Sequence, residues 1–215
     1  LGCIFISCAI PVGLEIYFCM KNSRQMVMSI AGAISWLLSL SIISLGWVGL
    51  PLDNKHFITI FLAFMFNEIT RFLVLTFSFF IQKKIGEIPL SGLGIGVGTA
   101  LCQVLIHNVP YLTLAAGPAE FAELRSSFLV VALNGLLYSI YIITSYASID
   151  HYWSAKAPEK FMTISFVVLH FLFLESSFVT EFFSAYIGIA AMVIIDCICI
   201  VMTAYTFHTY LTKSN

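Results

Sequence analysis

Charge is the scarcest property of this sequence. Only 10% of its 215 residues are Asp, Glu, Lys or Arg, whereas soluble domains carry about 25%. Hydrophobic residues make up 60% of the chain, and the mean hydropathy is +0.99. A soluble fold of this length could not bury so much apolar surface, but a bilayer accommodates it. The net charge of −1 implies no nucleic-acid partner, so the composition indicates an integral membrane protein.

The sequence also lacks N-x-S/T glycosylation acceptors and a cysteine framework in a polar loop. Its six cysteines lie inside or at the ends of apolar runs, so we expect reduced thiols buried as small hydrophobes. Cys197 and Cys199 alone are too few for a zinc site. The sequence therefore implies no metal and no cofactor.

Long apolar runs predict the fold. A helix needs about 20 largely apolar residues to cross a bilayer, and the runs are too long and too irregular for barrel strands. We therefore predict an all-α membrane protein, a single domain of seven transmembrane helices over residues 1–215. The expected spans lie near residues 3–20, 26–50, 57–81, 90–114, 126–149, 161–180 and 183–208.

Basic residues in the connecting segments predict the orientation. Two lie in the second and fourth loops, Lys55 and Arg125. Seven lie in the odd-numbered loops and at the C-terminus, namely Lys21, Arg24, Lys83, Lys84, Lys156, Lys160 and Lys213. Because loops rich in Lys and Arg stay in the cytosol, we expect a lumenal or extracellular N-terminus and a cytosolic C-terminus.

The fourth predicted span opens with two rows of small residues. Gly92, Gly96 and Ala100 are spaced four apart on one helix face, and Gly94 and Gly98 form a second row. Such rows let another helix backbone approach closely. They predict either a docking face for a partner helix or packing between the protein's own helices.

Several polar residues fall inside predicted spans. Glu68 and Arg71 are spaced i, i+3 in the third span, so they can pair on one helix face; the alternative is a catalytic Glu. His170 lies in the sixth span and suits a polar cavity within the bundle. Glu15 and Asp196, in the first and seventh spans, are expected to face the bundle interior.

Several blocks together resemble the Aph-1 family, the scaffold subunit of γ-secretase. Pro11 matches its first span. The other blocks, in the family's order, are AGAISWLLSL at 31–40 with LGWVGL at 45–50, NEITRF at 67–72 with Lys83 and Lys84 at the helix end, GLGIGV at 92–97, and LHFL at 169–172. Two positions depart from the family pattern. Tyr138 stands where the family has a second intramembrane His, and Ala100 where many relatives have Gly.

The resemblance implies a non-catalytic subunit that assembles with presenilin, nicastrin and the small presenilin-enhancer subunit in the bilayer. Such a complex cleaves single-pass proteins, including Notch-like receptors, and the aspartyl chemistry belongs to presenilin; this chain has no G-x-G-D motif. The resemblance also implies residence in the endoplasmic reticulum, Golgi, plasma membrane and endosomes. Glu68 and His170 would shape a polar interior, with Arg71 and Tyr138 beside them.

Two other classes of function stay open. An intramembrane protease of the CAAX-processing type would use Glu68 and His170, although Asn67 stands where a second Glu would be expected. A small transporter or channel would show an internal repeat or a helix broken at membrane depth, and the sequence has no convincing repeat.

Overall fold

The computed structural model describes residues 2–49, 56–85, 91–109, 128–154 and 185–213, together with residues 165, 168–170, 172–173 and 176. These residues are helical apart from the short turn at 20–22. The elements, in chain order, are α1 (Gly2–Leu14), η1 (Glu15–Cys19), α2 (Ser23–Gly49), α3 (His56–Ile85), α4 (Ser91–Gln103), η2 (Val104–Asn108), α6 (Phe128–Ser154) and α8 (Ala185–Lys213). The predicted all-α class is confirmed.

Four of these helical stretches are long and apolar enough to cross a bilayer. They are Gly2–Cys19, Ser23–Ile42, Leu129–Asp150 and Tyr186–Tyr205, and Ser91–Ile106 forms a shorter apolar helix. The structure is thus consistent with a helical membrane bundle. The total of seven spans and the orientation stay predictions, and most of the sixth predicted span, 161–180, lies outside the described residues.

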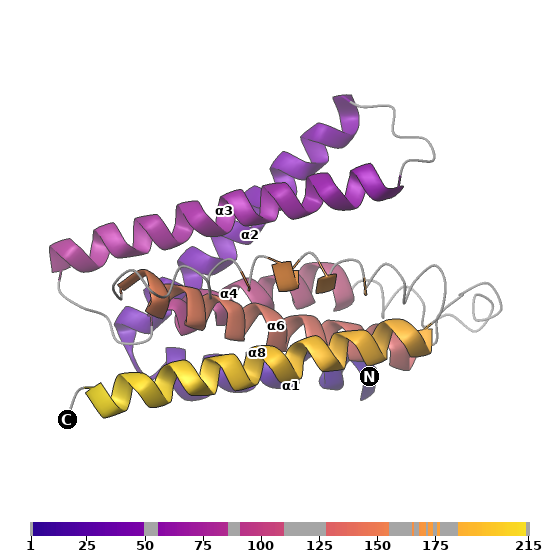
Figure 1. Cartoon of the computed structure of the whole chain (residues 1–215). Coiled ribbons are helices and arrows are strands. Elements are labelled where there is room, and N and C mark those ends of the chain that lie inside the picture. Colours follow the sequence, from indigo (N-terminus) through magenta and orange to yellow (C-terminus); the bar gives the residue numbers. More distant parts are fainter. Residues whose placement is uncertain are drawn as a thin grey trace.

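Helix α4 lies at the centre of the bundle. It packs between α2 and α6, while α1 and α8 pack against α6 and α3 packs against α2. Figure 1 shows α3 on the side of the molecule opposite α8 and α1. Eleven of the 13 residues of α4 are buried. This burial explains why α4 is built from small residues, since large side chains would hold its neighbours apart.

Two π-helical turns continue the helices at α1 and α4. In η1, the Met20 amide donates to the Glu15 carbonyl at 2.9 Å, a bond across five residues. Such turns rotate the helix faces and are frequent near functional sites. Here η1 lets the Glu15 carboxylate accept a hydrogen bond from the Ser29 hydroxyl of α2 at 2.7 Å. Glu15 therefore lies against the neighbouring helix, as expected for a polar group inside a span.

The six cysteines are all free thiols. Cys19, Cys102 and Cys199 are buried as expected, and Cys3 and Cys8 are partly buried. The expectation of burial is wrong for Cys197, which is exposed on the surface of the chain. The reason is its position on α8: Asp196 and Cys199 occupy the inward face of that helix and leave residue 197 outside it.

Candidate functional site: the glycine rows and the polar cluster

One glycine row of α4 faces α6. A Cβ added at Gly96 would lie 2.9 Å from Cα of Ile143 and 3.1 Å from Cβ of Tyr146. At Gly92 it would lie 2.5 Å from the Tyr146 carbonyl oxygen. Real Cβ atoms do not approach backbone so closely, so α4 and α6 touch here backbone to backbone. Only glycine permits that contact.

The second row faces α2. A Cβ at Gly94 would lie 2.6 Å from Oε1 of Gln25, and one at Gly98 would overlap the backbone of Ser29. Helix α2 also contributes a glycine to this contact, because a Cβ at Gly32 would overlap the backbone of Ile95 on α4. The Thr99 hydroxyl then donates to the Gly32 carbonyl at 3.1 Å. Small residues on both helices thus allow an interhelical hydrogen bond.

Both rows are therefore occupied by helices of this same chain. Ala100, which extends the first row, is fully buried in the core. Of the two interpretations that the sequence left open, these contacts support packing between the protein's own helices. A partner helix would have to displace α2 or α6 to reach the same rows.

The amino end of α4 is capped by a residue that the sequence interpretation did not single out. Asp150, near the carboxyl end of α6, accepts a hydrogen bond from the Ser91 hydroxyl at 2.6 Å and from the Gly92 amide at 2.9 Å. A carboxylate at a helix N-terminus satisfies an otherwise unpaired amide and complements the helix dipole. The contact fixes the register of α4 against α6. An acid at the end of a predicted span gave no signal of this role.

Glu68, Arg71 and His170 come together in one buried cluster. Arg71 Nη2 and His170 Nδ1 both contact Glu68 Oε1. All three residues are buried, with exposed fractions of 5%, 3% and 5%. His170 is 99 residues from Arg71 in the chain, and its Nδ1 lies 3.4 Å from Arg71 Nη2. The cluster joins α3 to the segment that contains residue 170.

Arg71 also reaches α6. Its Nη1 donates to the Ser145 hydroxyl at 3.2 Å, and its guanidinium carbon lies 5.9 Å from the ring centre of Tyr146. An unpaired charge at membrane depth costs roughly 2.5–3.5 kcal/mol on insertion scales. Pairing Glu68 with Arg71 removes the net charge, and the two contacts on α6 further satisfy the guanidinium. The ion pair therefore connects α3 to α6 and faces the interior of the bundle.

Aromatic rings cover the histidine. The ring of Tyr141 stacks on His170 with centroids 5.3 Å apart and on Phe173 with centroids 4.8 Å apart. Tyr138, one turn earlier on α6, packs against Phe173 at 5.5 Å. Tyr138 thus lies on the same cavity wall as His170, beside the cluster.

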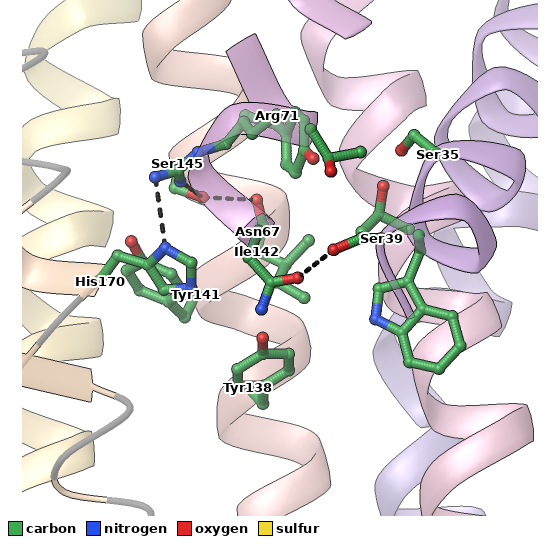
Figure 2. Close-up of a pocket in the computed structure, with 13 residues that line it drawn as sticks. Ser35, Ser39, Asn67, Arg71, Tyr138, Tyr141, Ile142, Ser145 and His170 are labelled. Atoms are coloured by element: carbon green, nitrogen blue, oxygen red, sulfur yellow. Dashed lines mark hydrogen bonds between the residues drawn. The ribbon is translucent and has the colours of Figure 1, made fainter. Parts of the chain in front are cut away.

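A small cavity of about 30 Å³ opens beside this cluster, with several polar side chains in its walls. Figure 2 shows Ser39 and Asn67 next to each other in its wall, where the Ser39 hydroxyl donates to Asn67 Oδ1 at 2.7 Å. The lining residues come from α2, α3, α4 and α6 and include His170. They are Ser35, Trp36, Ser39, Asn67, Thr70, Arg71, Thr99, Tyr138, Tyr141, Ile142, Ser145, Tyr146 and His170.

The cluster does not have the composition of a metal centre. Within the described parts of the chain, no three His, Cys, Asp or Glu side chains converge as metal ligands would. Glu68 Oε1 and His170 Nδ1 instead contact each other and Arg71. The arrangement is a neutralised ion pair with a histidine beside it. This chemistry suits cohesion between helices.

These features define a multi-pass helical membrane protein with a polar cluster inside a small-residue bundle. Residues 1–90 match the family model described as Aph-1 protein. The predicted resemblance to the Aph-1 family is therefore confirmed over residues 1–90. A comparison of the chain with curated proteins finds no match.

Proposed function

We propose that this chain is a non-catalytic scaffold subunit of γ-secretase. The observation that carries the proposal is the match of residues 1–90 to the Aph-1 family, a family of γ-secretase subunits. As such a subunit it would assemble with presenilin, nicastrin and the presenilin-enhancer subunit and support cleavage of single-pass proteins such as Notch-like receptors. It would reside in the endoplasmic reticulum, Golgi, plasma membrane and endosomes.

The polar cluster supports a structural role for the chain. Glu68 contacts both Arg71 and His170, and Arg71 continues to Ser145 on α6. A carboxylate paired with a guanidinium holds its negative charge in place and is a poor general base. The cluster instead ties three parts of the chain together, which is what a scaffold needs to present fixed helix faces.

The outer faces of the helices supply surface for partners. On α8, large apolar side chains on the outside include Tyr186, Ile187, Ile194, Val201 and Tyr205. In a membrane such faces meet lipid or other helices. Since the glycine rows are occupied internally, partner helices would dock on outer faces of this kind.

The contact between His170 and Glu68 is the one observation that favours a second candidate, an intramembrane protease of the CAAX-processing type. The substitution Glu68→Gln separates the two. In cells lacking their own Aph-1 subunit, a scaffold predicts less assembled complex but unchanged proteolysis per assembled complex. An enzyme predicts normal amounts of protein and loss of turnover, which would contradict the proposal.

Thr76→Ala is the matched control for this experiment. Thr76 lies on the same helix but on its exposed face, and its hydroxyl donates to the Phe72 carbonyl of its own helix. This variant should leave both complex recovery and proteolysis unchanged.

A further inference from the structure

Asp196 occupies the inward face of α8 at mid-span. The apolar stretch runs from Tyr186 to Tyr205, so Asp196 lies near its centre. The buried residues on this helix recur at helical spacing along one stripe that faces α6. They are Gly188, Met192, Ile195, Asp196, Cys199 and Thr203.

The two polar side chains of this stripe, Asp196 and Thr203, differ in their hydrogen bonding. Thr203 lies 2.8 Å from the Ser148 hydroxyl of α6 and donates to the Cys199 carbonyl at 2.7 Å. Asp196 is only 3% exposed, and neither of its carboxyl oxygens has a hydrogen-bond partner within the part of the chain that the structure describes. The Thr203 hydroxyl thus has hydrogen-bond partners, whereas the Asp196 carboxyl group on the same helix face has none among the described residues.

No described cation compensates Asp196. On its own helix the buried residue one turn further along is Cys199, which carries no positive charge. The buried guanidinium of Arg71 is already paired with Glu68. Helix α8 packs on α6. Among the α6 side chains that the structure describes, the ionisable ones are Tyr138, Tyr141, Tyr146 and Asp150, and none of them is a cation.

An ionised carboxylate in these surroundings would be unpaired and cut off from water. Burying such a charge without a partner costs far more than burying the neutral acid, so the group takes up a proton instead. The neutral form also supplies an O–H group that can donate within the bundle. The surroundings of Asp196 are those of a carboxylic acid.

We propose that Asp196 is a proton-binding site inside the seventh span. In the folded chain it takes one proton from water and holds it at neutral pH as a carboxylic acid, and this neutral form is the one that lets α8 pack against α6. The inference is independent of the scaffold role, because it depends only on the packing of α8.

Infrared spectroscopy of the full chain reconstituted in lipid bilayers tests the site directly. At pH 7 we expect the C=O stretch of a protonated carboxyl group, shifted in D2O and missing from the Asp196→Asn variant. Asp196→Leu provides a second variant that removes the same band. If the wild-type and both variant spectra superimpose in this region, Asp196 is ionised and the proposal is wrong.

Thermal unfolding over a pH series gives an independent readout. The folded chain would hold one proton more than the unfolded chain wherever a free aspartic acid is ionised, that is, above about pH 4. The ratio of folded to unfolded protein should therefore fall as pH rises from about 4 through neutral, by up to about tenfold per pH unit. Asp196→Asn should remove that component of the pH dependence. Identical pH profiles for wild type and variant would overturn the proposal, whether or not the variant is less stable overall.

Discussion

Asp150 on α6 holds the first turn of α4 by accepting hydrogen bonds from both the Ser91 hydroxyl and the Gly92 amide, at 2.6 and 2.9 Å. The same two helices are in backbone contact one turn further along, at Gly96 and Ile143. The cap and the glycine row thus act on the same interface. The cap positions the end of α4, and the glycines allow the rest of that helix to follow α6.

Removing the cap should destabilise the bundle. Asp150→Ala deletes both acceptor contacts and should cost about 1–2 kcal/mol, read as a lower unfolding temperature of the purified protein in detergent. Asp150→Asn retains an acceptor oxygen and should lose less. Equal unfolding temperatures for wild type and Asp150→Ala would show that the cap contributes nothing.

The glycine rows predict a contrast between two alanine substitutions. In Gly98→Ala the new methyl group would overlap the Ser29 backbone of α2, so the variant should unfold at a lower temperature or fail to accumulate. Gly13 has nothing within 4 Å of an added Cβ, and Gly13→Ala should be neutral or stabilising by up to about 1 kcal/mol, because alanine favours helix. If the two variants behave alike, close packing of α4 on α2 is not what the glycine row provides.

The sequence predicts where the helices of this protein lie along the chain better than it predicts which helices pack against each other. Apolar length alone identifies a membrane helix, because no other structure satisfies every backbone group in lipid. The small residues of α4 likewise predict close approach. They could not predict that Gly92 and Gly96 face α6 while Gly94 and Gly98 face α2, because that choice depends on how all the helices pack.

In the polar cluster, too, some contacts can be predicted from the sequence and others cannot. Glu68 and Arg71 are three residues apart, so a helical repeat is enough to predict their pairing. Their contacts with His170 and Ser145 join residues far apart in the chain and follow only from the tertiary structure. Tyr141 was missed altogether, since one Tyr among many aromatic residues carries no signal until its ring is seen stacked on His170.

A double-mutant cycle should reveal the pairing of Glu68 with Arg71. Glu68→Leu leaves a buried guanidinium without its carboxylate and should cost about 3–5 kcal/mol, whereas the Glu68→Leu/Arg71→Leu double variant removes both charges and should regain most of that loss. Unfolding temperatures of the two single variants, the double variant and the wild type measure the coupling. Strictly additive losses would show that the two side chains do not stabilise each other.

The predicted orientation is testable with engineered glycosylation sites. A sequon placed within residues 117–125, in the predicted fourth loop, should be glycosylated because this loop is expected in the lumen. A sequon placed within residues 155–159, in the predicted fifth loop, should stay unmodified in the cytosol. Gel mobility before and after glycosidase treatment reads both outcomes, and the reverse pattern would invert the topology.

Purification of the full chain from cells in mild detergent, followed by mass spectrometry of the proteins that accompany it, tests the scaffold proposal most directly. The account predicts recovery of presenilin, nicastrin and the presenilin-enhancer subunit in a fixed ratio to this chain, and their loss from a parallel purification of the Gly98→Leu variant, whose helix packing is broken. Recovery of the folded, membrane-embedded wild-type chain without these three proteins would contradict it.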